Sequence, residues 1–190
     1  MDSKAIFIDV LRGSGRDGID DLIEYLEAET DFFTAPASTR HHGAVPGGLV
    51  IHSLAVLENL TKLSQTFEFV VHPSSLTITA LLHDLCKANY YKASLRNVKN
   101  ESTGEWEKQP YYLIEDQFPL GHGEKSAILA MQFISLSAEE LLAIRWHMGA
   151  WDDAAQGYSG RQCLNVALTK NWLVGALHMA DTAATYFDNK

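Results

Sequence analysis

The spacing of apolar residues predicts a chain built mainly of helices. In residues 17–29 the apolar residues recur every three or four positions and so share one face of a helix: Ile19, Leu22, Ile23 and Leu26. Comparable signals predict a helix opened by Gly47-Gly48, one from Pro73 to about Lys87, and others over 122–134, 137–147 and about 165–187. Within these, Ser137 followed three residues later by Glu140 is typical of a capping box.

The helical pattern stops in the middle of the chain. Two segments there hold tyrosines and aliphatic residues, and they flank the polar sequence Asn100-Glu-Ser-Thr-Gly104. A polar turn between two such runs is typical of a β-hairpin, which we expect over residues 89–116. The sequence therefore predicts an all-α helical bundle with one small β-hairpin inserted, preceded by a helical N-terminal segment over residues 1–39.

Length and charge narrow the class of protein. The chain has 190 residues, which suits a single domain over residues 1–190. It carries 15 Lys+Arg against 24 Asp+Glu, a net charge of −9. That balance argues against a protein that coats nucleic acid or an anionic membrane through bulk charge, although a local basic groove is compatible with it.

The cysteine content and the length of the apolar runs indicate where in the cell the protein is expected. Cys86 and Cys163 do not form a CxxC pair, and two cysteines do not build a disulfide framework. The N-terminus lacks the long apolar run of a signal peptide. No segment approaches the ~18 apolar residues that are needed to span a bilayer. We therefore expect a cytoplasmic protein without membrane contact.

The strongest local chemical signal is the pair His83-Asp84, near the end of a predicted helix. Neighbouring His and Asp side chains can bracket a metal ion placed beside the helix, one from each side. A neutral nitrogen combined with an anionic oxygen suits borderline or hard divalent ions better than thiolate-binding ones. Taken alone, such a pair is more often a surface pair or a buried histidine with ordinary hydrogen bonds.

Two further polar residues lie on apolar helical stripes. His52 shares its stripe with Leu49, Val56 and Leu60, and Asp181 lies in a largely apolar helix. Burying a neutral histidine or a lone carboxylate costs free energy unless each finds a partner. A metal ion shared by these residues and the His83-Asp84 pair would compensate that cost.

The order of these residues resembles the H…HD…D signature of the HD-domain metal-dependent phosphohydrolases. The resemblance spans residues 40–187 and rests on three segments: Gly47-Gly-Leu-Val-Ile-His52, His83-Asp-Leu-Cys-Lys87 and His178-Met-Ala-Asp181. Domains of that family are all-helical, and the four signature residues bind a divalent metal that activates water against a phosphoester. The resemblance implies the same fold here, with a metal held by His52, His83, Asp84 and Asp181.

Two more histidines extend the match. His122 stands at the predicted start of one helix and His147 at the end of another, both before Asp181. The order H…HD…H…H…D resembles the HD proteins that hold two metals. It implies that Asp84 bridges the ions and that His122 and His147 complete the second, at the ~4 Å spacing of two-metal phosphoesterases. The alternative is a single metal, with His122 facing a phosphate.

Three basic residues are candidates for binding the phosphate: Arg40, Lys87 and Arg145. Lys87 lies one helical turn after His83, so its ammonium can reach the same cavity, and Asp84 and Lys87 are the candidate catalytic residues. Arg40 precedes the first metal helix, in a stretch that resembles exoribonuclease-type HD proteins. The alternatives are surface salt bridges for Arg40 and Lys87 and an outward orientation for Arg145.

Two further residues lie inside the matched segments. His178 precedes Asp181 by three residues, so it either orients that carboxylate or packs in the core. Cys86 is interpreted as a packing residue, because the signature does not require a cysteine there.

The aromatic residues of the insertion admit two interpretations. They are Tyr90, Tyr91, Trp106, Tyr111 and Tyr112. Aromatic residues in a hairpin are usually cross-strand packing pairs, which is the favoured interpretation because the charge of this insertion is mixed rather than basic. The alternative is stacking on bases, with the insertion acting as a lid or specificity loop.

The expected function is hydrolysis of a phosphoester by a metal-activated water, with a nucleotide or a similar small phosphorylated molecule as substrate. The acidic charge favours a small substrate. One alternative is a 3'-5' exonuclease or phosphodiesterase that acts on short single-stranded RNA or DNA, and another is a non-catalytic HD module that keeps the metal for sensing. One or two divalent ions are expected as cofactors, drawn from Mn, Fe, Ni, Co, Mg and Zn.

Overall fold

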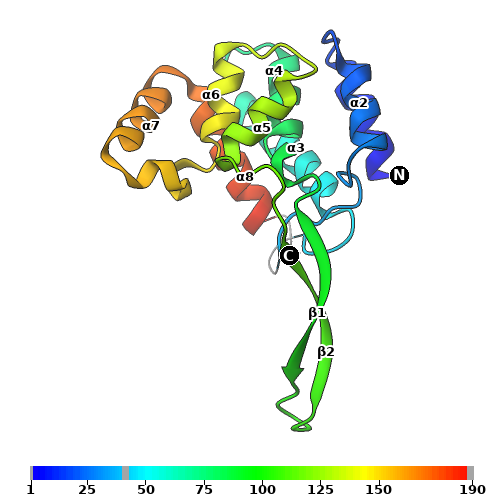
Figure 1. The fold of residues 1–190 in the computed structure, drawn as a ribbon. Coiled ribbons are helices and arrows are strands. Elements are labelled where there is room, and N and C mark those ends of the chain that lie inside the picture. Colours follow the sequence, from blue (N-terminus) through cyan, green and yellow to red (C-terminus); the bar gives the residue numbers. More distant parts are fainter. Residues whose placement is uncertain (1, 40–42, 188–190) are drawn as a thin grey trace.

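The computed structural model describes residues 2–39 and 43–187, and this part of the chain is mainly helical (Figure 1). Its α-helices are α1 (Ser3–Gly13), α2 (Ile19–Ala28), α3 (Gly48–Thr66), α4 (Pro73–Leu82), α5 (His122–Met131), α6 (Ala138–Trp146), α7 (Tyr158–Lys170) and α8 (Trp172–Tyr186). Between them lie β1 (Tyr91–Lys99), β2 (Trp106–Ile114) and the short 3-10 helices η1 (Leu85–Lys87), η2 (Gly149–Trp151) and η3 (Asp153–Gln156). None of the helices in this part is both long and apolar enough to cross a membrane.

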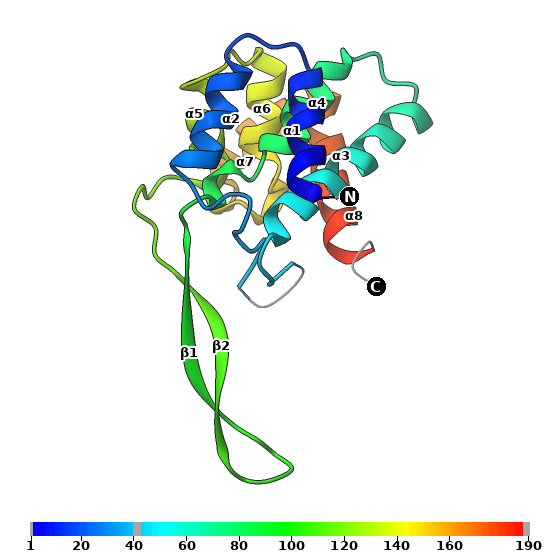
Figure 2. The ribbon, with the colours of Figure 1, turned by 90° about the vertical axis from the view of Figure 1, so that its right-hand side faces the viewer.

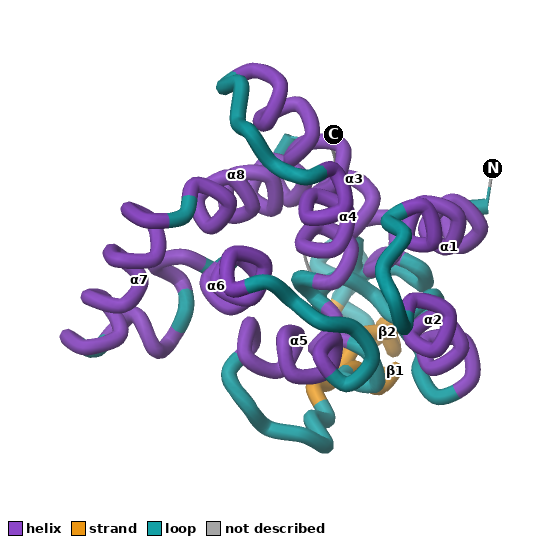
Figure 3. The backbone as a smooth tube through the Cα atoms, turned by 90° about the horizontal axis from the view of Figure 1, so that it is seen from above, coloured by secondary structure: helices purple, strands orange, loops and turns teal. Residues whose placement is uncertain are grey.

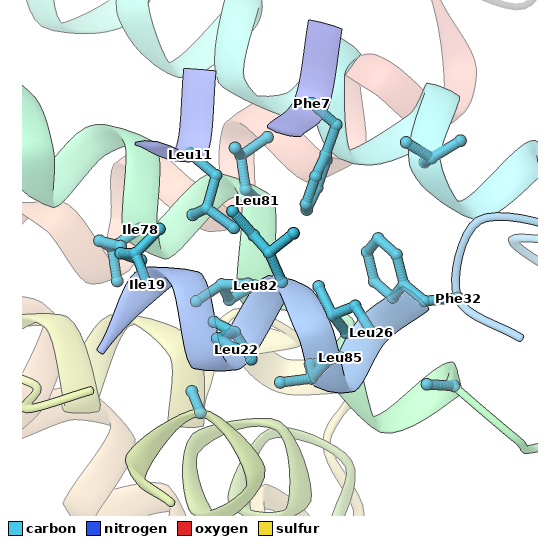
Figure 4. Close-up of a cluster of buried hydrophobic side chains, with 14 of the residues drawn as sticks. Phe7, Leu11, Ile19, Leu22, Leu26, Phe32, Ile78, Leu81, Leu82 and Leu85 are labelled. Carbon is cyan, nitrogen blue, oxygen red and sulfur yellow. The ribbon is translucent and has the colours of Figure 1, made fainter. Parts of the chain in front are cut away.

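The two N-terminal helices bury one face against the middle of the chain (Figure 4). Phe7 and Leu11 of α1 pack with Leu22 and Leu26 of α2 and with Leu81 of α4, and all five side chains are fully buried. Burial of one such side chain contributes about 1.5–3 kcal/mol. The apolar stripe that predicts a helix over residues 17–29 is therefore the surface that docks α2.

A second cluster of buried side chains lies among α3, α4, α6, α7 and α8. Val56 and Leu60 of α3 pack there with Leu173 and Leu177 of α8. Helices α3 and α4 contribute to both clusters and so form the centre of the molecule. Seen from above, α1 and α2 lie on one side of this centre and α7 lies on the opposite side (Figure 3).

The start of α3 depends on two glycines. Gly47 caps the helix with a φ of +75°, in the left-handed region that glycine tolerates best. A Cβ at Gly48 would collide with the carbonyl oxygen of Gly43. These glycines let the helix begin against a neighbouring backbone segment, and the helix then carries His52 into the interior.

A partly buried ion pair ties the connection between α1 and α2 to the start of α6. Glu140 is fully buried and accepts hydrogen bonds from the guanidinium of Arg16 and from the backbone N–H of Ser137. The Ser137 hydroxyl accepts from the Glu140 N–H, so the predicted capping box is confirmed. Burial alone would raise the pKa of Glu140, but the Arg16 hydrogen bond lowers it below its ordinary value.

The insertion is a hairpin that projects from the helical body (Figures 1 and 2). Its strands pair antiparallel along their full length, with Tyr91 opposite Ile114 and Lys99 opposite Trp106. Among the described elements these strands pack chiefly on each other. The Tyr91 and Tyr112 rings lie 6.3 Å apart across the strands, as cross-strand packing requires. The prediction of a hairpin over residues 89–116 is confirmed, but its tip points away from the helices.

The prediction of one helix over about 165–187 is wrong. The chain forms α7 and α8 instead, which part at Asn171, whose φ of −137° and ψ of 101° are extended. The Asn171 side chain accepts a hydrogen bond from the Leu173 N–H and donates one to the Glu139 carbonyl. An asparagine in this place is a capping signal that apolar periodicity alone overlooks. Helix α4 also ends earlier than predicted, at Leu82.

Candidate metal centre

Six polar residues from separate elements meet in the centre of the helical body. His52 lies in α3, His83 and Asp84 follow α4, His122 begins α5, His147 follows α6, and Asp181 lies in α8. Four of the six are buried: His52, His83, Asp84 and His147. The structure therefore brings together all the residues that the sequence predicts as metal ligands.

The two carboxylate oxygens of Asp84 face different pairs of histidines. Its Oδ2 atom faces Nε2 of His83 at 3.4 Å and Nε2 of His52 at 3.7 Å. Its Oδ1 atom faces Nε2 of His122 at 2.8 Å and Nε2 of His147 at 3.6 Å. One carboxylate thus presents one oxygen to each group.

Asp181 belongs to the Oδ2 side of this arrangement. Its Oδ1 atom lies 3.1 Å from Nε2 of His52 and 3.9 Å from Nε2 of His83. The donor atoms of these three residues all lie within 4.8 Å of one another, as do those of His83, Asp84 and His147. Each set is compact enough to hold one ion, and His83 belongs to both.

The ring orientations of His83 and His147 fit metal ligation. Nδ1 of His83 donates to the carbonyl oxygen of Ala80 at 2.8 Å, and Nδ1 of His147 donates to that of Ile144 at 2.7 Å. With the proton on Nδ1, the Nε2 atom of each neutral ring carries a lone pair. Both Nε2 atoms are buried and make no hydrogen bond within the described residues. Burial also lowers the pKa of His147, which favours the neutral ring that a metal needs. A carbonyl partner for the second nitrogen is the usual arrangement around metal-binding histidines.

The charges in the centre keep both carboxylates ionised. Burial alone would raise the pKa of Asp84, but Lys87 and His83 hold it well below its usual range. Burial likewise opposes the ionisation of Asp181, yet the hydrogen bond with His52 lowers the pKa of that carboxyl. Burial also disfavours the charge of Lys87, but the Asp84 carboxylate raises the pKa of the ammonium above its ordinary value.

Cys86 contacts the candidate ligand His122. Its Sγ atom lies 3.3 Å from Nδ1 of His122, and the donor atoms of Asp84, Cys86 and His122 form a third compact group. Burial disfavours the charge of His122, but the sulfur of Cys86 and the carboxylate of Asp84 raise the pKa of its ring to about 10. The interpretation of Cys86 as a packing residue misses this contact, for which the position two residues after Asp84 is the only signal in the sequence.

His178 forms a hydrogen bond with the backbone of the candidate ligand His147. Its Nδ1 donates to the carbonyl oxygen of His147 at 2.7 Å. Its ring also lies where a Cβ on Gly149 would stand, and Gly149 has a φ of +55°. His178 thus supports the backbone that follows His147. This role differs from both alternatives that the sequence offers, namely orienting the Asp181 carboxylate and packing in the core.

The three predicted phosphate-binding cations differ in placement. Lys87 lies in the centre, with Nζ 2.7 Å from Oδ2 of Asp84 and 14% of its side chain exposed. Arg145 is held by Glu124 of α5 at 2.5 Å and by Asp152, in the segment that follows α6, at 2.7 Å. Arg40 lies outside the described residues. Phosphate binding by each of the three stays a prediction.

Comparison with known proteins agrees with this geometry. A family model described as HD domain matches residues 49–172, which is more than half of the chain. That range contains five of the six candidate ligands, and Asp181 lies beyond its end. Searches among curated proteins and among solved structures returned no significant match.

Proposed function

This chain belongs to the HD-domain family of metal-dependent phosphohydrolases, and we propose that it hydrolyses a phosphoester of a nucleotide or a similar small phosphorylated molecule. The observation that carries the proposal is the position of Asp84, whose two oxygens face different pairs of histidines. A carboxylate with a single structural partner has no need of such an arrangement. The arrangement suits a site for two cations that share one ligand.

The donor set divides between two cations. His52, His83, Asp181 and Oδ2 of Asp84 would hold the first, and His122, His147 and Oδ1 of Asp84 would hold the second. Nitrogen and oxygen donors suit borderline and hard divalent ions, which leaves Mn, Fe, Ni, Co, Mg and Zn as candidates. Divalent ions held there would supply an activated water and neutralise charge on the phosphoryl oxygens.

Lys87 holds the central carboxylate in place. Its ammonium donates to Oδ2 of Asp84 at 2.7 Å, and it is almost enclosed. This contact restrains Asp84 so that each oxygen keeps facing its own group of histidines. It also keeps a positive charge inside the site, which favours an anionic phosphate bound there.

The exposure of the candidate ligands indicates the route of approach. His83 and His147 are fully buried, whereas 30% of the His122 side chain is exposed. The substrate phosphate would therefore reach the site from the His122 side. Enclosure of the other histidines excludes bulk water and strengthens the electrostatic interactions inside the site.

The net charge supports a small substrate. A chain with a net charge of −9 repels a long polyanion more strongly than it repels a single nucleotide. Short single-stranded RNA or DNA remains the second candidate, and a sensing module that binds metal without catalysis is the third. The second candidate would hydrolyse RNA or DNA in preference to nucleotides, and the third would bind metal without hydrolysing any substrate.

The proposal is tested by measuring phosphate release from nucleotides and sugar phosphates, and nucleotide release from short single-stranded RNA, with each divalent metal and with a chelator. We expect hydrolysis of nucleotides that the chelator abolishes and that added metal restores. His83→Ala should abolish it, whereas His72→Asn should retain it, because asparagine keeps the cap that His72 provides at the start of α4. Full activity in His83→Ala, or metal binding with no hydrolysis of any substrate, would contradict the proposal.

A further inference from the structure

A cavity of about 330 Å³ opens beside the metal centre on the His122 side. His122 and Cys86 line it, so it reaches the group of ligands that faces Oδ1 of Asp84. Its other walls come from Tyr90, from residues 116–125 and from residues 148–154. The volume is at the lower end of the ~300–1,000 Å³ range of small-molecule sites, which suits one nucleoside rather than a chain of nucleotides.

Aromatic and apolar side chains supply part of the lining, including Tyr90, Leu120, Met148 and Trp151. Trp151 is 79% exposed, although a tryptophan of this size gains free energy when its ring is covered. Its segment follows His147, whose carbonyl oxygen accepts a hydrogen bond from His178. Tyr90 is held by the ammonium of Lys125, which lies 5.2 Å from the centre of its ring. Two aromatic rings beside an open volume suit a planar aromatic ligand.

The charged residues of the cavity favour amino groups over phosphate. Lys125 is neutralised by Asp116, at 2.5 Å, and Arg145 is already shared by two carboxylates of the lining. The side chain of Asp153 also lines the cavity, and no hydrogen bond or ion pair joins it to another described residue. The surplus charge of these walls is therefore negative, so they favour N–H donors over a phosphate, which the cations at the metal centre would hold instead.

We propose that this cavity is a nucleoside subsite, in which a base with an exocyclic amino group stacks on Trp151 and donates to Asp153. The proposal rests on the proposed function for the position of the phosphate, which would lie at the metal centre while the nucleoside enters the cavity. A base of this kind is found in adenosine, guanosine and cytidine nucleotides. Uridine lacks the amino group and should bind less tightly.

Binding of nucleosides that carry no phosphate tests the subsite apart from catalysis. Calorimetric titration of the metal-loaded protein should show that adenosine and cytidine bind more tightly than uridine. Trp151→Ala should weaken adenosine binding about tenfold or more, because stacking on an aromatic ring is lost. Trp106→Ala is the matched control: Trp106 is 70% exposed on the projecting hairpin, and its loss should leave the affinity unchanged. Asp153→Asn should reduce the preference for adenosine over uridine.

The outcomes separate the subsite from the proposed reaction. Nucleoside binding without hydrolysis of any nucleotide would support the subsite and contradict the proposed function. Hydrolysis of phosphate esters without nucleoside binding would do the reverse. Unchanged adenosine affinity in Trp151→Ala would overturn the subsite, and a loss in Trp106→Ala would move base recognition to the hairpin.

Discussion

Asp84 contacts or faces most of the other polar residues of the metal centre. Its Oδ2 accepts from Lys87 and faces His52 and His83, while its Oδ1 faces His122. The carboxylate is buried and ionised, because Lys87 and His83 lower its pKa against the effect of burial. At the scale of single residues, the site is therefore a buried anion held by one ammonium and surrounded by imidazole nitrogens.

Replacing Lys87 tests that description. Lys87→Met removes the ammonium that restrains Asp84 and contributes positive charge near the phosphate, and it keeps most of the side-chain volume. We expect kcat to fall by about 100-fold, as when a charge-stabilising donor is lost, with metal content retained. Steady-state kinetics and metal analysis measure both quantities. Lys92→Met, which removes an exposed ammonium of the hairpin, is the control, and equal activity of the two variants would contradict the role of Lys87.

Glu140 offers a test of electrostatics away from the metal centre. In the folded protein the pKa of Glu140 is lowered below its ordinary value of 4.5. The ionised carboxylate therefore stabilises the fold fully above pH 4.5, and this stabilisation is lost as the pH falls through the lowered pKa. Glu140→Gln should cost about 2–3 kcal/mol of the free energy of unfolding at neutral pH, because Arg16 loses its buried partner.

Urea unfolding of wild type and Glu140→Gln at neutral and strongly acidic pH measures this contribution. The difference in stability between the two proteins should shrink as the pH falls below 4.5. Glu139→Gln, in the exposed neighbouring position, should match the wild type at both pH values. A difference that stays constant with pH would show that the charge of Glu140 is not the cause.

At the scale of elements, three of the six candidate ligands lie at helix ends. His83 and His147 follow the last turns of α4 and α6, where each Nδ1 donates to a carbonyl three residues earlier. The last carbonyls of a helix lack partners within the helix, so one hydrogen bond satisfies a carbonyl and also aims Nε2 at the centre. His122 reaches the same point from the first position of α5.

This placement explains what could be predicted from the sequence. The stripe of α3 predicts that His52 points inward, and the family signature supplies the remaining ligands. Periodicity misplaced the end of α4, because the chain turns at His83 so that His83 and Asp84 face the same cavity. It also missed the cap at Asn171. The contact between Cys86 and His122 and the support of the His147 carbonyl by His178 depend on tertiary packing, which local patterns do not encode.

The hairpin is an element whose removal the helical body should tolerate. Lys92 and Leu113 face each other in register, so an Asn-Gly turn placed between them replaces residues 93–112 with a two-residue hairpin loop. Because the strands pack chiefly on each other, we expect the melting temperature to change by no more than about 2 °C. Calorimetry measures it. A large loss of stability would mean that the hairpin contributes to the core.

At the scale of the whole molecule, the formal net charge understates how well the protein can bind an anion. Two divalent cations would change the net charge from −9 to −5, since −9 + 4 = −5. They would place that positive charge in one pocket bordered by Lys87. The acidic surface would then limit the size of an anionic substrate without preventing its phosphate from binding.

The central claim is that Asp84 bridges two metal ions, and a crystal structure of the metal-loaded protein with anomalous scattering tests it most directly. The account predicts two metal ions per chain about 4 Å apart. The first should lie against His52, His83 and Asp181 and the second against His122 and His147, with one oxygen of Asp84 on each. A single ion, or ions that leave either oxygen of Asp84 without a metal, would contradict it.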